Sequence, residues 1–593
     1  MVLQRFSLPL FFLCYAILFQ PSAGRAQREP SSGQFDGPAE LPRVYVKSAL
    51  ADTPAPGKSI LVKTSAELTS ALDKAVCGDT IQLQAGATFV GSFKIPAKSC
   101  DDQHWIILRT SVADQDLPVE GVRITPCYAG VASLPGRPEY ACPAPKNVMA
   151  KVVFNDHGSG PFTFLPGANH YRLVGLEITR DAPGAVTYNL VSIPEKATID
   201  HIVWDRVWMH GTAQDETTRG IALGGSRYLA VVDSYFSDFH CVAVTGACGD
   251  SQAIAGGIGS EPMGPYKIVN NFLEASGENI ILGGGPADYV PSDIEIRHNH
   301  MFKPLNWAPG SEGFVGGKSG RPFIVKNLFE LKNGQRVLFE GNILENVWGG
   351  FTQAGFGILL TPKNPGTCNV CTVRDITIRF SRITHAGAAM QIANGLSDPG
   401  FAAREGSHYS IHDLIFDDMA YKNCPGCNRD LFQIGSAPQA PQTFWIHDVS
   451  IRHVTVATDR ARAAWVIAGP VGQQNMVFQD NIVDSGTSGF INAGGGATQC
   501  YFQQEVMKGI LDRCWASYKF DHNVIMNAHP AHRWPSDNWP TGGNGQVGFV
   551  SWNGGVDGDY HLSAKSRFKK KASDGKDPGA DIDAINQATK GAA

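Results

Sequence analysis

Clustered positive charge is absent from this sequence of 593 residues. Charged side chains make up only 18% of it, the formal net charge is −5, and no long run of Lys or Arg occurs. Nucleic-acid binding depends on clustered Lys and Arg that neutralise phosphates. We therefore expect no nucleic-acid partner. Sparse charge with abundant glycine is instead typical of a turn-rich β protein.

Apolar runs long enough to cross a bilayer are also lacking. The longest extends from Phe6 to Phe19, between Arg5 and small residues that end at Ala26. A membrane helix needs about 20 apolar residues, whereas this layout is that of a secretory signal peptide. We predict a signal peptide over 1–26, a Pro/Gly/Ser-rich linker over 27–59, and a mature protein that is secreted or periplasmic and has no membrane span.

What the chain does contain is a recurring motif: apolar residues alternating with polar ones, then Asn or Asp, then another apolar pair. The clear copies are YKIVNNFL from Tyr266, DIEIRHNHMF from Asp293, VLFEGNIL from Val337, MVFQDNIV from Met476 and YKFDHNVI from Tyr518, and looser copies begin at Ile202, Leu229, Ile376, Leu414 and Val449. The alternation indicates strands, and a repeat of roughly 27 to 43 residues indicates stacked coils. Leucine-rich repeats and propellers are the alternatives, but their LxxLxL period and Trp-Asp signature are missing. The pattern predicts an all-β solenoid, a single-stranded parallel β-helix over 60–530.

Each copy is too short to bury its apolar face alone, so the copies must stack. The stacking predicts one internal ladder, formed by Ile268, Ile296, Phe339, Ile378, Phe416, Ile451, Phe478 and Phe520. The Asn or Asp after each strand suits a bend, because its side chain bonds nearby backbone and tolerates left-handed dihedrals. Stacked turn asparagines are expected to bond to one another along the solenoid.

The two ends of the solenoid carry different sequences from the coils. The helical spacing of Leu68, Leu72 and Val76, with Ser65 as a candidate N-cap, predicts a helix that covers the first coil. We predict a C-terminal cap and tail over 531–593. Within the tail, Asp574, Asp577, Asp581 and Asp583 suggest either a Ca²⁺ site or a solvated turn.

Twelve cysteines remain once Cys14 of the signal peptide is set aside, and they occur as close neighbours. The expected disulfide pairs are Cys77/Cys100, Cys127/Cys142, Cys241/Cys248, Cys368/Cys371, Cys424/Cys427 and Cys500/Cys514. An even number of cysteines in an exported chain favours local disulfides. The alternative is a four-thiolate zinc site made by the two CxxC motifs at Cys368 and Cys424.

Several stretches resemble the right-handed parallel β-helix superfamily of pectate-lyase-like proteins. These are the helix that leads into Gly78-Asp79-Thr80-Ile81, DSQAI from Asp250, PSDIEIRHNH from Pro291 and VKNLFELKNGQRVLFEGNILENVW from Val325. The first looks like the entry segment of alginate and chondroitin lyases, and the others look like an uncharacterised group of secreted bacterial β-helix proteins. The resemblance implies a right-handed coil and action on acidic polysaccharides.

The catalytic motifs of these families are not found. The WIDH and Arg-x-Pro-x-x-Arg segments of pectate lyases and the Asn-Thr-Asp, Asp-Asp, Gly-His-Gly and Arg-Ile-Lys set of polygalacturonases are missing. The alginate and chondroitin lyase group has a calcium-binding glutamate pair shortly before a lysine base. Here Glu278 has no lysine close behind it, and Glu330 is only two residues from Lys332. The resemblance therefore transfers no catalytic residue.

Candidate site residues gather in the middle of the chain, between Asp250 and Trp348. Elimination from a uronic acid needs a cation beside the carboxylate and a base for the C5 proton. Strand alternation places Phe329 and Leu331 inside and Glu330 and Lys332 outside. The candidate catalytic residues are Lys332, Glu330, His298, His300 and Lys303; the candidate substrate-binding residues are Asp250, Gln252, Asn279, Arg297, Trp307 and Trp348; and the candidate ligands of a Ca²⁺ ion are Glu278 and Glu330. The alternatives are a solvated Glu330–Lys332 ion pair and tryptophans packed beneath loops.

These observations lead to one functional hypothesis and two rivals. We predict a secreted, monomeric polysaccharide lyase that cleaves a uronate-containing glycan by β-elimination. The first rival is a glycoside hydrolase on the same fold, which needs two carboxyl groups about 5 to 9.5 Å apart. The second rival is a glycan-binding surface protein without catalytic activity.

Overall fold

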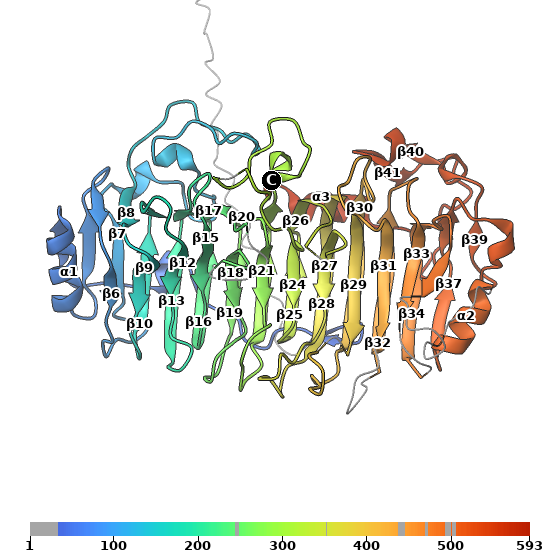
Figure 1. Ribbon diagram of the computed structural model, residues 1–593, viewed down its shortest axis with the longest axis horizontal. Helices are drawn as coiled ribbons and strands as arrows, with labels where there is room; N and C mark the ends of the chain where they lie inside the picture. Colours follow the sequence, from blue (N-terminus) through green and yellow to red (C-terminus); the bar gives the residue numbers. More distant parts are fainter. Residues whose placement is uncertain are drawn as a thin grey trace, which may run out of the picture.

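The computed structural model describes residues 34–242, 248–318, 320–351, 353–395, 397–436, 445–468, 472–492, 500 and 506–593. The predicted signal peptide over 1–26 lies outside these residues. The described chain winds into a long stack of parallel strands, with helix α1 at one end and helix α2 at the other (Figure 1). The predicted parallel β-helix is confirmed.

Each full coil contributes strands to three faces. The first two faces form one bent sheet of 25 strands, because several strands run through the corner between them without a break. The strands of the first face are β3 (Ser59–Val62), β4 (Thr80–Leu83), β7 (Ile106–Thr110), β10 (Asn169–Val174), β13 (Ile199–Asp205), β16 (Ser226–Val232), β19 (Tyr266–Val269), β22 (Ser292–Arg297), β25 (Gly334–Glu340), β28 (Val373–Ala386), β30 (Ser407–Asp417), β32 (His447–Val456), β34 (Gln474–Gln479) and β37 (Tyr518–Asp521).

The second face completes the bent sheet, and the third face is a separate sheet of 12 strands. The second face consists of the later halves of β28, β30 and β32 with β5 (Thr88–Val90), β8 (Ala150–Phe154), β11 (Leu176–Arg180), β14 (Trp208–His210), β17 (Tyr235–Phe239), β20 (Phe272–Ala275), β23 (His300–Phe302), β26 (Ile343–Val347), β35 (Ile482–Asp484), β38 (Val524–Met526) and β39 (Trp539–Pro540). The third face consists of β6 (Phe93–Ile95), β9 (Gly158–Phe164), β12 (Thr187–Ser192), β15 (Thr217–Ala222), β18 (Gln252–Gly256), β21 (Glu278–Leu282), β24 (Phe329–Leu331), β27 (Phe356–Leu360), β29 (Ala388–Asn394), β31 (Asp430–Ser436), β33 (Ala463–Ala468) and β36 (Phe490–Asn492).

The predicted apolar ladder is present, with one correction. Strand register aligns Ile268, Ile296, Phe339, Ile378, Ile411, Ile451, Phe478 and Phe520 in one buried row. Ile411 therefore takes the place predicted for Phe416, which pairs instead with Ile383 one face further on. The prediction was wrong at this coil because β30 continues through the corner. The strand therefore carries two buried apolar residues, Ile411 on the first face and Phe416 on the second, and the sequence pattern does not distinguish them.

The predicted asparagine ladder is also present at the corner between the first two faces. Asn299 Nδ2 donates to Asn342 Oδ1 at 3.0 Å, and Asn271 Nδ2 donates to Asn299 Oδ1 at 3.0 Å. A second run joins Asn481, Asn523 and Asn538. The left-handed backbone that the sequence assigned to these asparagines belongs to the residue before each one, such as His298 at φ 57°. The bend and the ladder thus use two neighbouring residues.

Helices cover both ends of the stack. Helix α1 (Ser65–Lys74) buries Leu68 and Leu72 against the first coils, and its N-cap is Thr64, one residue before the predicted Ser65. Val76 lies beyond the helix and is 58% exposed. Helix α2 (Met507–Cys514), which the alternation pattern did not predict, covers the last coil with its buried side. Both helices shield coil edges that would otherwise pair with foreign strands.

The C-terminal segment folds back along the stack instead of hanging free. Strands β40 (Phe549–Ser551) and β41 (Asp559–Leu562) form a small sheet near the last coils. Helix α3 (Ile582–Thr589) packs through Ile582 and Ile585 against Ile415 at the second face (Figure 1). The final residues reach the middle of the solenoid, where the carbonyl of Ala592 accepts a hydrogen bond from Arg123.

All six predicted disulfides are formed: Cys77–Cys100, Cys127–Cys142, Cys241–Cys248, Cys368–Cys371, Cys424–Cys427 and Cys500–Cys514. The two CxxC motifs each close on themselves, so their thiols make no shared zinc site. The disulfides pin loops to the coils and restrict the unfolded chain.

Residues 34–58, which we call the N-terminal strap, are not a linker. Strands β1 (Phe35–Asp36) and β2 (Ala39–Glu40) begin the strap beside β28 and β30, and the strap then runs back along the first face towards β10. Asp36 accepts hydrogen bonds from Arg379 at 2.6 Å and Ser410 at 3.1 Å, and it lies 3.2 Å from His412. At the other end, the Arg172 guanidinium donates to Thr53 Oγ1 at 3.0 Å. The Pro, Gly and Ser content of this segment suggested a flexible linker, but charged and polar contacts at both ends hold the strap against the first face.

Replacing Asp36 by Asn is expected to weaken strap docking by about 1 to 3 kcal/mol, because its carboxylate accepts charge-assisted bonds. Burial alone would raise the pKa of Asp36, but His412 and Arg379 outweigh it and lower this pKa to about 2. Burial alone would lower the pKa of His412, but Asp36 and Asp413 outweigh it and raise this pKa to about 9. The Asp36 contribution is therefore lost as the pH falls from about 4 through 2, and the His412 contribution is lost as the pH rises from about 6.5 through 9. Limited proteolysis of the strap against pH measures this. Glu40→Gln, which only breaks a pair with Arg43 inside the strap, is the control; equal cleavage of both variants would contradict the expectation.

Candidate functional site

A groove lies on the outer side of the third face, across β12, β15, β18, β21 and the end of β24. Its cavity has a volume of about 380 Å³. Ala222 on β15 and Ala255 on β18 form part of the groove floor, and their small side chains leave the groove open above them. Strands lie about 4.8 Å apart, so the five strands give the groove a length of about 19 Å, enough for several sugar rings.

A row of polar side chains crosses the start of these strands. Register pairs Asn189 with Arg219, Arg219 with Gln252, and Gln252 with Glu278. Arg219 lines the groove, and among the described residues no hydrogen bond or ion pair engages its guanidinium. A free guanidinium in a groove suits a bidentate contact with a carboxylate. Sequence reasoning missed Arg219, because it has the same parity as the inward Ile221 and alternation alone would place it inside.

A chain of alternating charges lies beside this row. Lys326 Nζ is 3.1 Å from Asp250 Oδ2 and 3.5 Å from Glu278 Oε1. Gln252 Nε2 donates to the other Glu278 oxygen at 2.9 Å. Lys326 was also missed by the sequence analysis, although it stands just before the predicted Glu330. The ammonium group of Lys326 holds together two carboxylates from adjacent coils.

Glu330 and Lys332 continue this chain on the next strand. Phe329 and Leu331 pack in the core as predicted, and Glu330 lies on the outer side, yet it is only 3% exposed. Lys332 Nζ is 2.9 Å from Glu330 Oε1, and Asn327 Nδ2 donates to Glu330 Oε2 at 3.0 Å. The ion pair that the sequence offered as the alternative is therefore present, but it is mostly shielded from solvent and lies at the groove wall, where Lys332 lines the cavity.

Burial and mutual repulsion set the protonation of the carboxyl groups. Burial and the nearby Glu278 charge raise the pKa of Asp250 to about 7, although Lys326 opposes the shift. Burial also raises the pKa of Glu330, and the nearby Glu278 charge adds to this shift, although Lys332 opposes it. Burial disfavours ionised Glu278 too, but Lys326 and Lys332 outweigh it and hold its pKa far below the ordinary value. The group that changes charge near neutral pH at the groove is thus Asp250.

The two lysines stay charged in this setting. Burial disfavours their ammonium forms, but Glu278 and Asp250 raise the pKa of Lys326, and Glu330 and Glu278 raise the pKa of Lys332. The side chain of Lys332 is 18% exposed and that of Asp250 is 28% exposed, so both reach the groove. The groove therefore places the Asp250 carboxyl group, which can accept a proton, beside the charged ammonium groups of Lys326 and Lys332.

Lys303 and Asn279 lie beneath the groove instead of in it. Lys303 Nζ is fully buried, donates to the carbonyls of Ala275 at 2.8 Å and of Gly277, and lies 3.4 Å from Asn279 Oδ1. Burial lowers the pKa of Lys303 to about 7. Lys303 thus binds the turn that carries Glu278, and Asn279 Nδ2 donates to the carbonyls of Leu273 at 2.6 Å and Phe302 at 2.9 Å. Neither side chain lines the groove.

The predicted His298, His300 and Arg297 are not brought to this groove. His298 lies between Asn270 Oδ1, at 3.1 Å, and the Lys590 carbonyl, at 2.9 Å, under the C-terminal tail. His300 Nε2 is 2.7 Å from Glu345 on the second face. Arg297 pairs with Glu295 and Glu340 on the first face. These residues are close in sequence to Glu278 and Glu330, but the corner turns them to other faces.

The two predicted stacking tryptophans are buried. Trp307 and Trp348 are each 1% exposed. Trp307 packs edge to face on Phe323 and lies under Arg137. Neither ring has a free face for a sugar, which is the arrangement that the sequence analysis gave as the alternative.

The predicted calcium positions do not fit that ion. A calcium ion takes six to eight oxygen ligands, whereas the Glu278 and Glu330 carboxylates are already compensated by two ammonium groups. The C-terminal acidic residues are engaged by other groups: Asp577 pairs with Lys569, Asp581 caps α3, Asp574 lies beside His453 and Asp583 lies beside His561. Their placement agrees with the solvated-turn alternative.

No family model matches the sequence, and no curated protein matches it. Among solved structures, the chain is similar to an alginate lyase from Paenibacillus sp. str. FPU-7, with 14% identity and TM-score 0.29 over 79% of this chain and 99% of the other. It is also similar to a PL6 family polysaccharide lyase from Pseudopedobacter saltans, with 10% identity and TM-score 0.39 over 81% and 95%. A family 28 exopolygalacturonase from Yersinia enterocolitica gives 10% identity and TM-score 0.39 over 82% and 79%. All three are right-handed parallel β-helix proteins.

Proposed function

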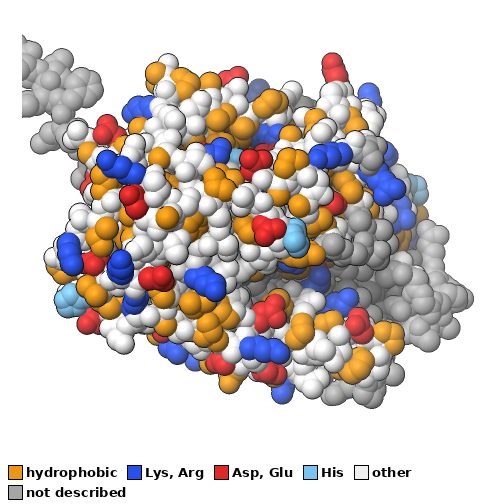
Figure 2. Space-filling model, turned by 60° about the vertical axis from the view of Figure 1, so that its left-hand side comes forward, with side chains coloured by type: hydrophobic (Ala, Val, Ile, Leu, Met, Phe, Trp, Pro, Cys, Tyr) orange, Lys and Arg blue, Asp and Glu red, His pale blue; other side chains and the backbone are white. Residues whose placement is uncertain are grey.

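We propose that this protein is a polysaccharide lyase that binds a uronate-containing glycan along the groove of the third face. The observation that carries the proposal is the juxtaposition of three side chains around one cavity: Arg219, which has no partner among the described residues, cationic Lys332, and the carboxyl group of Asp250. Permanent cations suit an acidic glycan, and a carboxyl group that titrates near pH 7 suits a general base. On the face shown in Figure 2, Lys and Arg side chains are interspersed with Asp and Glu.

In the proposed reaction, Arg219 binds the uronate carboxylate and stabilises the charge that develops when the C5 proton leaves. Asp250, in its ionised form, takes that proton. The electrons of the C5–H bond form the C4–C5 double bond, and the C4–O bond breaks. Lys332 gives its proton to the departing oxygen, which leaves as a hydroxyl group.

This assignment changes the role that the sequence suggested for Lys332. A raised pKa keeps Lys332 protonated at neutral pH, which favours a proton donor over a base. Glu278 and Glu330 hold the two lysines in place. No step of the proposed reaction passes through a metal ion.

Glycoside hydrolysis is less well supported by the same geometry. It needs two carboxyl groups on either side of the scissile bond, about 5 to 9.5 Å apart. Glu278 and Glu330 are buried, and each carboxylate is engaged by a lysine and an amide, so they do not face each other across the groove.

Export and a monomeric state belong to the proposal as well. Six disulfides suit an oxidising compartment outside the cytoplasm. Within the described residues, no helix is both long and apolar enough to cross a membrane.

Incubation with alginate, pectate and glycosaminoglycans, followed by absorbance of the unsaturated product, tests the proposal. We expect turnover on at least one of these glycans without added metal. Arg219→Ala should raise KM for that glycan by about 10-fold or more, because a charge-assisted contact contributes about 1.5 to 3 kcal/mol. Arg374→Ala, which removes a half-exposed arginine of the first face, is the control. Reducing sugar without unsaturated product would indicate hydrolysis, and retention without turnover would indicate a binding protein; either result overturns the proposal.

A further inference from the structure

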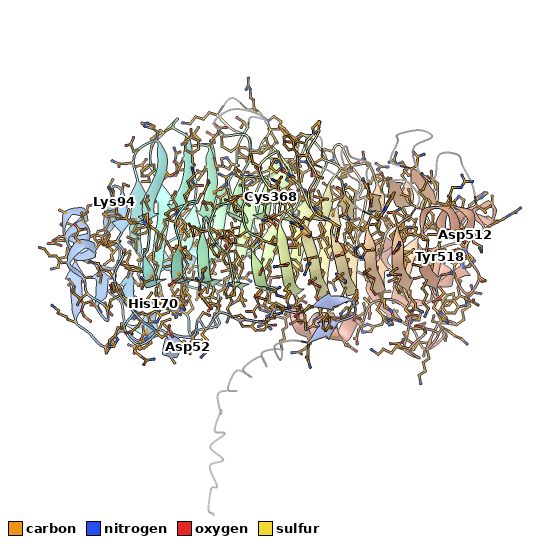
Figure 3. The ribbon with its side chains drawn as sticks, turned by 90° about the horizontal axis from the view of Figure 1, so that it is seen from below. Asp52, Lys94, His170, Cys368, Asp512 and Tyr518 are labelled. Carbon is orange, nitrogen blue, oxygen red and sulfur yellow. A yellow bond between two sulfur atoms is a disulfide. The ribbon has the colours of Figure 1, made fainter. Side chains whose placement is uncertain are left out.

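A second cluster of functional side chains lies on the first face, near the N-terminal end and away from the groove. His170 on β10 and His201 on β13 occupy equivalent positions of adjacent coils, and their rings stack at 4.4 Å with an interplanar angle of 4°. Tyr228 on β16 continues the stack at 4.6 Å from His201. Figure 3 shows His170 near this end of the solenoid. The three residues share a left-handed bulge, with φ values of 54°, 53° and 49°, which repeats from coil to coil and aligns their side chains.

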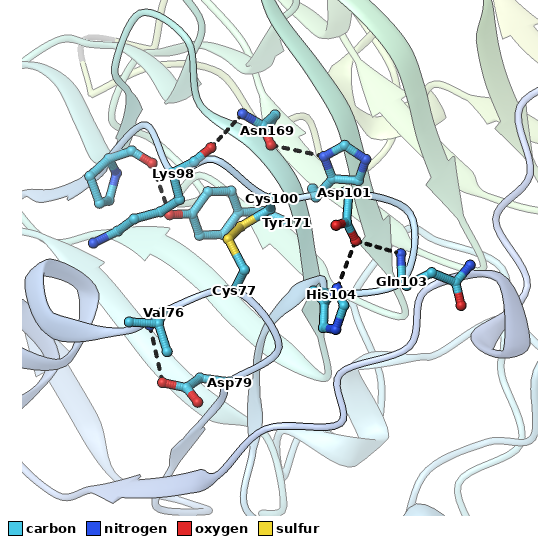
Figure 4. Close-up of a disulfide and its surroundings, with 12 residues drawn as sticks. Val76, Cys77, Asp79, Lys98, Cys100, Asp101, Gln103, His104, Asn169 and Tyr171 are labelled. Carbon is cyan, nitrogen blue, oxygen red and sulfur yellow. Dashed lines mark hydrogen bonds and ion pairs between the residues drawn. A yellow bond between two sulfur atoms is a disulfide. The ribbon is translucent and has the colours of Figure 1, made fainter.

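Asp102 faces both histidines from a loop outside the coils. Its Oδ1 lies 3.1 Å from His170 Nε2 and 3.9 Å from His201 Nε2. The three donor atoms all lie within 4.8 Å of one another. The Cys77–Cys100 disulfide closes the chain just before this loop, as Figure 4 shows. The loop is therefore tied to the first coils while the Asp102 side chain, 76% exposed, can adjust.

Hydrogen bonds fix the orientation of the His170 ring. Asn169 Nδ2 donates to the carbonyl of Lys98 at 2.7 Å, as Figure 4 shows, and to that of Gly167 at 3.0 Å. Its Oδ1 must therefore be the atom that faces His170 Nδ1 at 2.8 Å. An amide oxygen only accepts, so Nδ1 carries the proton. In neutral His170 the lone pair of Nε2 then points at the Asp102 carboxylate.

His201 repeats this arrangement. Its Nδ1 lies 2.9 Å from Asp200 Oδ1, and a carboxylate also accepts, so here too Nε2 is the free nitrogen. Protonating both rings would place two positive charges in a stack at 4.4 Å. Three possible ligand atoms, His170 Nε2, His201 Nε2 and an Asp102 carboxylate oxygen, thus lie within 4.8 Å of one another. A bound cation satisfies all three.

We propose that His170, His201 and Asp102 bind one divalent transition-metal ion of the zinc type. Two imidazole nitrogens and one carboxylate are ligands that zinc favours, whereas calcium and magnesium prefer oxygen alone. Tetrahedral zinc with bonds near 2.0 to 2.1 Å needs donors about 3.3 Å apart, so a small closure of Asp102 and His201 completes the set. The Nδ1 bonds to Asn169 and Asp200 are the outer-shell contacts that orient metal-bound histidines.

The site opens on a cavity, so a ligand can reach the metal. This cavity has a volume of about 680 Å³ and is lined by Asp102, His201, Trp105, Arg227 and residues of the N-terminal strap. Three protein ligands leave a coordination position for water or another small ligand. The strap thus covers one side of the proposed metal site.

Binding of zinc and cobalt to the untagged, full-length mature protein tests this proposal. After dialysis against a chelator, calorimetry with Zn²⁺ should show one site per chain, and Co²⁺ should give the visible absorption bands of a site with nitrogen ligands. His201→Ala should abolish binding, and Asp102→Ala, on an exposed side chain that the fold does not need, should weaken it at least 10-fold. Asp200→Asn should weaken it about 10-fold through the outer shell.

The matched control is His104→Ala, which removes a histidine of the same loop that bonds Asp101 and not the cluster. It should bind zinc like the unchanged protein. Absence of Zn²⁺ and Co²⁺ binding, displacement of Zn²⁺ by excess Ca²⁺, or equal loss in His104→Ala and His201→Ala would each overturn the proposal. None of these results depends on lyase activity, so the metal site and the groove are tested separately.

Discussion

Replacing Asp250 by Asn is expected to lower kcat for uronate elimination by about 10²- to 10⁴-fold, the usual contribution of a general base. The amide keeps the shape of the side chain and its contact with Lys326 but cannot accept the C5 proton. In the unchanged protein the base works only when ionised. Because its pKa is about 7, the rate should fall about 10-fold per pH unit below 7 and level off above it. Absorbance of the unsaturated product at saturating substrate measures both effects.

The matched control for Asp250 is Asp288→Asn, in the exposed loop that follows β21. It should leave kcat unchanged within about two-fold, since surface substitutions away from a site have small effects. If Asp250→Asn retained full activity, or if its pH profile matched that of the unchanged protein, Asp250 would not be the base.

Replacing Asn299 by Ala is expected to lower the free energy of unfolding by about 3 to 5 kcal/mol, because several buried groups lose their partners together. Asn299 Nδ2 donates to the Ile268 carbonyl at 2.8 Å and to Asn342 at 3.0 Å. Its Oδ1 accepts from the Asn271 backbone N–H and from Asn271 Nδ2, both at 3.0 Å. Alanine removes all four bonds and leaves no route for water. Urea unfolding with the disulfides intact measures the change.

Asn369→Ala is the control for this substitution. Asn369 is exposed and accepts one side-chain bond, from Asn364 at 3.1 Å. We expect a loss of about 0.5 kcal/mol or less. A similar midpoint for Asn299→Ala and the unchanged protein would mean that the ladder is a consequence of the coil and does not stabilise it.

Part of the groove could be read from the residues themselves. Alternation within NLFELK places Phe329 and Leu331 in the core and Glu330 outside, and the structure agrees because a strand repeats every two residues whatever surrounds it. The polar character of Asp250, Gln252 and Glu278 likewise marked adjacent coils, whose register then brought them together.

The rest of the site could not be read in this way. The alternation of inward and outward side chains is interrupted wherever the chain bends. Arg219 therefore reaches the groove although it is two residues from the inward Ile221. His300 lies on another face although it is close in sequence to Glu278. Asp102 and His170 are 68 residues apart, and no local pattern relates them. Contacts of this kind depend on which loop lies over which coil.

The sequence by itself determined the solenoid, the apolar ladder, the turn asparagines and the cysteine pairs. Each of these follows from local periodicity or from the nearness of partners along the chain, which stacking simply repeats. Only the tertiary structure decided which charged groups share a groove, which are buried and neutralised, and where the strap and tail dock. Those outcomes depend on corners and long loops, and on the free energy of each charge in its final surroundings, which no stretch of sequence contains.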